Sequence, residues 1–346
     1  MRILRLPQWL ALLFFVCAGA YLVHLNTSRP RILVVQSYFN DYSWTRDIDA
    51  GIRRALNNPT AYTVRWHYLD LKRHTDEPFR KRAANSAIKV IEDWKPDVIL
   101  AVNDAAQQYV AKNYVNHPTI KIVYAAINGE PSKYGYDKAN NVTGIVERKA
   151  LVALRETMIE VAKAKGIAAD KVRFINIGDR SDSILANERY ILDQDWAPIK
   201  LVDSKLVASF DEWKKVVIDA EKTADFIIFA NYRNLLKTPG QAKNFVSAKT
   251  VMEWTEKNSV AIPLGIQGFN VEDGAPISVG PSPLEQGEIS GDMAEAIILG
   301  KAPKDIPTES TRQYVVYMSE SKLKARKLTI PAIHEAFARA ANTYFP

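Results

Sequence analysis

One stretch of this sequence places polar side chains where they could bind a ligand. In residues 97–106, an apolar run leads directly into Asn103 and Asp104. A continuous apolar run of this length is typical of a parallel strand that is buried on both faces. Open α/β sheets bind ligands beyond the carboxyl ends of such strands, where helix N-termini point inward. We therefore expect Asn103 and Asp104 to lie at a ligand-binding edge.

The spacings that mark common catalytic and metal sites are absent from the sequence. It contains no G-x-S-x-G, G-x-x-x-x-G-K-[ST] or H-E-x-x-H motif, and its single cysteine is Cys17. The five histidines are scattered without the spacing of metal ligands. We expect a binding protein without a cofactor rather than an enzyme. A metal-free hydrolase that uses Asp104 or Glu147 is the alternative, because a strand-end carboxylate can act as an acid or a base.

Length and composition indicate a folded protein of two domains. The chain has 346 residues, of which 47% are hydrophobic and 25% charged, and domains usually contain roughly 100–200 residues. The formal charge is +7, but lysines and arginines alternate with acidic residues and form no basic stripe. Nucleic acid is therefore not an expected partner.

The N-terminal segment, residues 1–30, has the pattern of an export signal followed by a linker. Two arginines precede the apolar run 9–16, and the small residues 18–20 resemble a cleavage site. The alternative is an uncleaved anchor over residues 9–25, although this stretch is short for a bilayer span.

Beyond this segment, apolar strands alternate with amphipathic helices in two successive series. This alternation predicts βαβ crossovers, and hence an α/β protein with a mainly parallel sheet in each of two Rossmann-like lobes. We expect the first lobe to contain residues 31–144 and about 275–306, and the second to contain 145–274 and about 307–346. Strands are expected at 31–38, 62–70, 97–104 and 120–128 in the first lobe and at 171–178, 199–207, 225–231 and 260–267 in the second.

Five stretches, in order along residues 31–346, resemble motifs of one family. They are KPDVILA at 95–101, INGEP at 127–131, NNVTG at 140–144, LEQGEISGDMAEAIILGKAPKDIP at 284–307 and SKLKARKLTIP at 321–331. In this order they are similar to the ABC-transporter substrate-binding proteins of the tryptophan- and tyrosine-binding group, which have the type I periplasmic-binding-protein fold. The sequence departs from the family at 127–131, where a Thr-Asp-Pro turn is usual.

The resemblance implies an exported, periplasmic protein that captures a small molecule between two lobes joined by a multi-strand hinge. Closure about the hinge would enclose the ligand, which the protein would deliver to an ABC permease. Some members of the group sense ligands for a membrane signalling partner, so a sensing module is the alternative. The resemblance does not separate these two uses.

Residues at the expected strand ends, together with Trp44, are the candidates for such a cleft. Aromatic rings could bury an apolar ligand body, and amide or charged groups could hold its polar ends. Asp104 suits an ammonium group and Arg180 a carboxylate, so the ligand could be aromatic or similar to an amino acid. The candidates are Gln36, Ser37, Tyr38, Trp44, Asn103, Asp104 and Asn128 from the first lobe and Asp179, Arg180, Asn231, Tyr232, Gln267 and Phe269 from the second.

Four of these candidates also have a purely structural interpretation. Trp44 repeats at helical spacing with Ile48, so it could belong to the core. Asp104 could cap the helix that follows it, and Asp179 with Arg180 could form a solvated turn.

Overall fold

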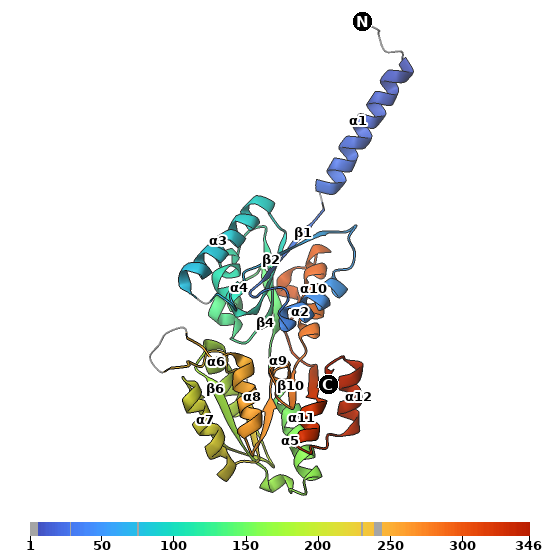
Figure 1. Ribbon diagram of the computed structural model, residues 1–346. Coiled ribbons are helices and arrows are strands. Elements are labelled where there is room, and N and C mark those ends of the chain that lie inside the picture. The colour runs from blue at the N-terminus through green and yellow to red at the C-terminus, as the bar shows by residue number, and fades with distance from the viewer. Residues whose placement is uncertain (1–5, 28, 75, 230, 239–243) are drawn as a thin grey trace.

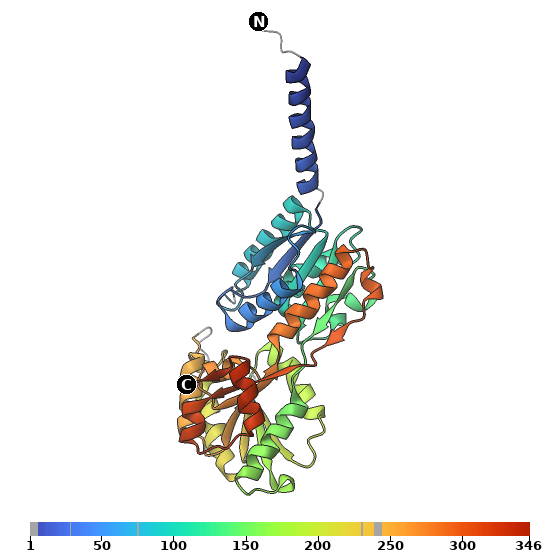
Figure 2. The ribbon, with the colours of Figure 1, turned by 90° about the vertical axis from the view of Figure 1, so that its right-hand side faces the viewer.

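The computed structural model describes residues 6–27, 29–74, 76–229, 231–238 and 244–346. The chain forms two α/β lobes, one above the other, and a helix that projects from the first lobe (Figures 1 and 2). Each lobe is built on one sheet of predominantly parallel strands. The predicted fold class is therefore confirmed.

The first lobe contains a fully parallel sheet with the strand order β11-β5-β4-β3-β1-β2. All residues of β3 are buried, because helices cover both faces of the sheet. Helices α2 and α10 pack on one face, and α3 and α4 on the other. The strands are β1 (Arg31–Gln36), β2 (Thr63–Tyr68), β3 (Val98–Val102), β4 (Lys121–Ile127), β5 (Val142–Val146) and β11 (Glu309–Ser310). The helices are α2 (Ser43–Ala55), α3 (Glu77–Trp94), α4 (Asn103–Tyr109) and α10 (Pro283–Ile298).

The second lobe has the strand order β13-β12-β10-β9-β8-β6-β7, in which only β10 and β12 pair antiparallel. Helices α7 and α8 pack on one face, and α5 and α6 on the other. The strands are β6 (Arg173–Asp179), β7 (Lys200–Val207), β8 (Phe226–Phe229), β9 (Ile262–Gly265), β10 (Ile277–Pro281), β12 (Tyr314–Ser319) and β13 (Tyr344–Phe345). The helices are α5 (Leu151–Ala164), α6 (Asp182–Asp193), α7 (Phe210–Asp219), α8 (Ala248–Asn258), α9 (Phe269–Glu272), α11 (Glu320–Ala325) and α12 (Ala332–Ala340).

The chain passes between the lobes after β5, after β10 and after β11. The last two crossings differ from the ranges expected for the lobes. Strand β10 lies within 275–306 but pairs with β9 in the second sheet, and β11 lies within 307–346 but pairs with β5 in the first. The reason is that strand pairing, which the sequence pattern does not encode, decides the sheet to which a short strand belongs.

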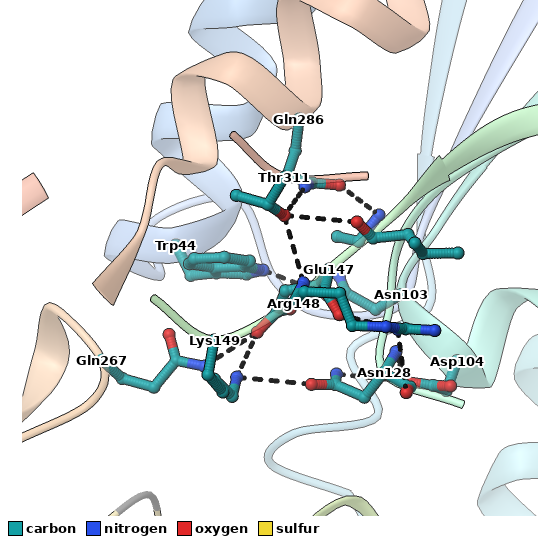
Figure 3. Close-up of polar contacts among 12 residues, drawn as sticks. Trp44, Asn103, Asp104, Asn128, Glu147, Arg148, Lys149, Gln267, Gln286 and Thr311 are labelled. Atoms are coloured by element: carbon teal, nitrogen blue, oxygen red, sulfur yellow. Dashed lines mark hydrogen bonds and ion pairs between the residues drawn. The ribbon is translucent and has the colours of Figure 1, made fainter. Parts of the chain in front are cut away.

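Hydrogen bonds tie the first and third crossings to each other and to α10, the helix that follows the second crossing (Figure 3). The Thr311 amide donates to Val146 O at 3.1 Å, and Thr311 Oγ1 accepts from the Arg148 amide at 3.1 Å. Gln286 Nε2 donates to Thr311 Oγ1 at 2.7 Å, while Gln286 Oε1 accepts from the Ala126 amide at 2.8 Å. The hinge is therefore a connected unit that is fastened to β4 of the first lobe.

Helix α1 (Leu6–Thr27) leaves the first lobe at the end distant from the second (Figures 1 and 2). It exposes large apolar side chains, among them Trp9, Phe14 and Phe15. Within the described ranges, no helix is both long enough and apolar enough to cross a membrane.

Helices α2 and α10 approach each other at glycines. A Cβ atom on Gly287 would lie 2.1 Å from Ile48 O, and one on Gly51 would lie 2.3 Å from Leu284 O. The two helix backbones are therefore in direct contact here. A change of side-chain rotamer could not make room for an added Cβ atom.

We predict that Gly287→Ala lowers the free energy of unfolding by about 1–3 kcal/mol, because the added methyl group forces α2 and α10 apart. Urea denaturation measures this change. Gly19→Ala is the matched control, since a Cβ atom there meets nothing within 4 Å. Equal stability of Gly287→Ala and the parent protein would contradict the close packing.

Candidate functional site

A cavity of about 60 Å³ lies between the two lobes. Its lining comes from the loops that follow the carboxyl ends of both sheets, together with α2, α6, α9 and the first hinge crossing. This is where the strand-end rule places a ligand site. The lining residues are Tyr38, Tyr42, Trp44, Lys72, Asn103, Asn128, Glu147, Lys149, Ile184, Asn231, Gln267 and Phe269.

The cavity is small because the lobes touch around it. Ser43 Oγ donates to Glu272 Oε2 at 2.9 Å, and the rings of Tyr42 and Phe269 lie 6.4 Å apart. Sites for small molecules usually measure about 300–1,000 Å³. A solute larger than a few water molecules therefore requires the lobes to separate before it enters.

Asn103, which lines this cavity, keeps one buried amide donor that no described residue accepts. The Trp44 indole Nε1 donates to Asn103 Oδ1 at 3.0 Å, and an indole nitrogen can only donate. This contact fixes the amide so that Nδ2 points elsewhere, buried and without a hydrogen-bond partner. Asn103 also has a positive φ of 64°, at the junction of β3 and α4.

Two lining amides of the second lobe each keep one buried acceptor without a donor among the described residues. Gln267 Nε2 donates to Glu147 Oε1 at 2.9 Å, and Asn231 Nδ2 donates to Asp179 Oδ2 at 2.9 Å. Because a carboxylate only accepts, both amide orientations are fixed. Gln267 Oε1 and Asn231 Oδ1 are left buried and unpartnered.

The three free atoms belong to residues that line one cavity and come from both lobes. Most buried polar atoms in proteins have a partner, and leaving one without a partner costs about 1–3 kcal/mol. Such a cost is tolerable where a ligand or ordered water supplies the missing bond. This arrangement can therefore hold a small polar molecule by contacts to both lobes.

A buried ion pair forms the hinge side of the cavity (Figure 3). Lys149 pairs with Glu147, and their side chains are 2% and 3% exposed. Lys149 Nζ also contacts Asn128 Oδ1 at 3.3 Å. The pair links both lobes, because Glu147 also accepts the hydrogen bond from Gln267.

Lys72 places a further positive charge on the cavity wall. Its Nζ lies 4.9 Å from the ring centre of Tyr38 and 5.4 Å from that of Tyr42. Burial, aided by the nearby Arg233 guanidinium, lowers the pKa of Lys72 to about 8. Burial also raises the pKa of Tyr38 far above its ordinary value, so this phenol stays neutral.

The structure brings seven of the sequence candidates together on the cavity wall. Six others do not line it. The seven are Tyr38, Trp44, Asn103, Asn128, Asn231, Gln267 and Phe269, and the six are Gln36, Ser37, Asp104, Asp179, Arg180 and Tyr232.

Asp104 holds a loop of its own lobe. Its carboxylate accepts from the backbone amides of Asn128 and Gly129, from Asn128 Nδ2 and from the Tyr134 hydroxyl. A carboxylate has about four acceptor positions, so these contacts occupy Asp104. It neither lines the cavity nor caps a helix that begins after it, because α4 already begins at Asn103.

Asp179 has the same role in the second lobe. It accepts from the Ser181 amide and hydroxyl, from Asn231 Nδ2 and from the Asn234 amide. It therefore positions the loop after β8, as Asp104 positions the loop after β4. The solvated turn expected over Asp179 and Arg180 is wrong for Asp179, which ends β6 and is fully buried. Arg180 is exposed, and its Nε donates to Leu206 O at 3.2 Å.

The remaining three candidates have partners within their own lobes. Ser37 Oγ donates to Val102 O and accepts from the Ala106 amide. Gln36 Nε2 donates to Asp49, and Tyr232 donates to Asp273. Side chains at strand ends alternate in direction, so only some of them face the space beyond the sheet.

Four lining residues, Tyr42, Lys72, Lys149 and Ile184, were not among the sequence candidates, and Glu147 was considered only as a catalytic acid or base. Tyr42 and Lys72 lie in loops a few residues beyond β1 and β2. Extending the strand-end rule to the whole following loop would have found both. Lys149 and Glu147 lie on a hinge crossing, which the sequence pattern of strands and helices does not mark.

We predict that Asp104→Ala lowers the free energy of unfolding by about 2 kcal/mol or more, because it leaves buried donors of the 128–134 loop unpaired. Thermal and urea denaturation measure this loss. Asp137→Ala is the control, since Asp137 is exposed and close in sequence. An unchanged melt of Asp104→Ala would show that the loop does not depend on this carboxylate.

We also predict a pH dependence for Lys72. The unfolded chain, with an ordinary lysine pKa of 10.5, binds this proton more tightly than the folded protein, whose pKa is about 8. Over this interval, stability contributed by Lys72 therefore rises with pH. Relative to the parent protein, Lys72→Met should raise the free energy of unfolding, measured by urea denaturation, by more at pH 7.5 than at pH 10. Lys81→Met, at an exposed position, is the control for the loss of a lysine side chain. If the difference in free energy of unfolding between Lys72→Met and the parent protein did not change with pH, the lowered pKa of Lys72 would be contradicted.

Solved structures share this architecture. A conserved domain protein from Vibrio cholerae O1 biovar El Tor has a TM-score of 0.63 at 16% identity, covering 92% of this chain and 100% of that chain. An ABC domain from Streptococcus pneumoniae in complex with L-Trp has a TM-score of 0.62 at 16% identity, covering 88% and 98%. A substrate binding protein with adhesive properties from Clostridium difficile, in a ligand-free, open structure, has a TM-score of 0.61 at 19% identity, covering 88% and 96%. These identities establish the fold alone.

The family match covers far more than a single motif. No curated protein matches the sequence. Residues 50–343, however, match the model of one family, described as ABC transporter substrate binding protein. The members of this family bind solutes outside the cytoplasm and supply them to ABC importers. Because the match covers most of both lobes and all three hinge crossings, the chain belongs to the family of ABC transporter substrate binding proteins.

Proposed function

We propose that this protein captures its solute in the cavity between the lobes and closes around it for delivery to the importer. The proposal rests on three residues from both lobes, Asn103, Asn231 and Gln267, which line one cavity and each keep one buried amide atom without a partner. A bound solute supplies the missing hydrogen bonds to both lobes at once. It therefore favours the closed arrangement over an open one.

Contacts at the rim of the cavity support closure about the hinge. The Ser43–Glu272 hydrogen bond and the Tyr190–Glu130 hydrogen bond each join one lobe to the other. Both lie on exposed side chains, where such contacts are individually weak. They can break when the lobes separate, while the hydrogen bonds of Thr311 keep the crossings together.

Aromatic side chains give the site room for an apolar part of the solute. Tyr38, Tyr42, Trp44 and Phe269 line the cavity beside the free polar atoms. Aromatic faces and a few fixed polar groups together suit an amphipathic ligand. We therefore favour a small solute that combines an apolar body with polar ends, such as an aromatic one.

The location that we propose is the periplasm, since the sequence of residues 1–30 has the pattern of an export signal. The segment is either removed on export or holds the protein at the inner membrane. The two-lobed body, which begins at β1, contains the whole cavity in either case.

A ligand screen by thermal denaturation tests the proposal. A ligand at 100 times its dissociation constant stabilises the folded protein by about 2.7 kcal/mol, so one class among amino acids, hydroxy acids, sugars and nucleosides should raise the melting temperature. In Gln267→Ala the rise should largely disappear. The control is Gln108→Ala, because Gln108 is exposed on α4.

Two outcomes contradict the proposal. The first is that no solute stabilises the protein. The second is that a solute stabilises Gln267→Ala as strongly as the parent protein, which would place its site outside this cavity.

A further inference from the structure

The unpartnered amide atoms of the residues that line the cavity are divided by lobe. The first lobe offers donors, namely Asn103 Nδ2 and the Lys72 ammonium group. The second lobe offers acceptors, namely Asn231 Oδ1 and Gln267 Oε1. A ligand that satisfies both sides has acceptors at one end and N–H or O–H donors at the other.

Lys72 differs from the other cations of the cleft because no carboxylate pairs with it. Lys149 pairs with Glu147, and Arg233 Nη2 pairs with Asp273 at 2.5 Å. In the described part of the chain, the Lys72 ammonium contacts only the ring faces of Tyr38 and Tyr42 and forms no ion pair. A half-buried ammonium of this kind is the natural partner for an anionic group.

The charge on the cavity wall has the same implication. Lys72 and Lys149 contribute two positive charges and Glu147 one negative charge, which leaves a net charge of +1. Asp104 and Asp179 lie behind the wall, where hydrogen bonds from their own loops occupy them. A ligand with one net negative charge would neutralise the wall.

The carboxylate on the cavity wall already forms an ion pair, so it offers an ammonium group no unpaired negative charge. Glu147, the carboxylate on the wall, already accepts from Lys149 and from Gln267. The second lobe therefore offers neutral amide oxygens to the donor end of the ligand. A hydroxyl group satisfies them without introducing a second positive charge beside Lys149.

We propose that the cavity selects a small hydroxy carboxylate, whose carboxylate binds Lys72 and Asn103 and whose hydroxyl donates to Asn231 or Gln267. This inference rests on the proposed function and assigns the chemical class of its solute. Lys72 is then the residue that determines specificity. A neutral ligand would leave its ammonium group desolvated and unpaired, which disfavours binding.

The test compares ligands that differ only in charge. Calorimetry on the parent protein measures dissociation constants for 3-phenyllactate, phenylalanine and 3-phenyllactamide, and for the smaller set lactate, alanine and lactamide, with glucose and ribose as neutral sugars. We expect at least one hydroxy acid to bind about tenfold more tightly than its amino acid and its amide. Lys72→Met should weaken that binding by about 10–100-fold, the effect of losing a hydrogen bond to a charged group.

Two controls separate folding from binding. Lys72→Gln keeps a polar side chain and should lose affinity as Lys72→Met does, whereas Lys81→Met, on the exposed side of α3, should bind as the parent protein does. The unliganded melt of each variant shows whether it is folded. If both Lys72 variants fail to fold, the order of affinities among the matched ligands decides the question on the parent protein.

The outcomes distinguish this inference from the function on which it rests. Tighter binding of an amino acid, an amide or a sugar overturns the hydroxy carboxylate and leaves the solute-binding function standing. Unchanged affinity in a folded Lys72 variant overturns the role of Lys72 alone. If no ligand of the panel binds, the inference is overturned, and if the wider thermal screen is also negative, so is the proposed function.

Discussion

The cavity depends on hydrogen-bonding partners that act in one direction only. An indole nitrogen donates and never accepts, and a carboxylate accepts and never donates. Trp44 therefore turns the Asn103 amide, and the carboxylates of Glu147 and Asp179 turn the amides of Gln267 and Asn231. In each amide, one of the two polar atoms is hydrogen-bonded within the protein and the other has no partner among the described residues. The polarity of the site, with donors on one lobe and acceptors on the other, follows from these three contacts.

The two lobes position their lining asparagines in the same way. In each, a carboxylate within two residues of a strand end, half-buried in Asp104 and buried in Asp179, holds the loop that follows a neighbouring strand. Asp104 positions Asn128, and Asp179 positions Asn231, so the carboxylate lies behind the wall while the asparagine lies on it. The charged carboxylates thereby hold the loops in place, and the neutral asparagine amides line the site. This division is favourable because a rigid, prearranged site loses less conformational entropy on binding.

Much of this arrangement was predictable from the sequence, since the period of apolar residues determines strands, helices and the edge at which strands end. Residues such as Asn103, Asn231 and Gln267 were found by that rule. Whether a strand-end side chain faces the ligand or its own lobe depends on the loop beside it, so Asp104 and Tyr232 could not be separated from them. Equally, the sheet that receives β10 or β11 is decided by pairing between distant segments. Lys72 could not be predicted as a site residue, because its lack of a carboxylate partner depends on which residues lie near it in space.

Capture of the solute between the lobes can be tested by measuring the distance between the lobes with and without solute. Spin labels at Lys133→Cys and Arg189→Cys, both on exposed side chains of opposite lobes, can be introduced after Cys17→Ser removes the native thiol. Pulsed electron paramagnetic resonance then records the distance distribution for the solute identified by thermal denaturation. The account predicts a shift to shorter and narrower distances on binding. An unchanged distribution, with binding demonstrated in the same sample, would contradict capture between the lobes.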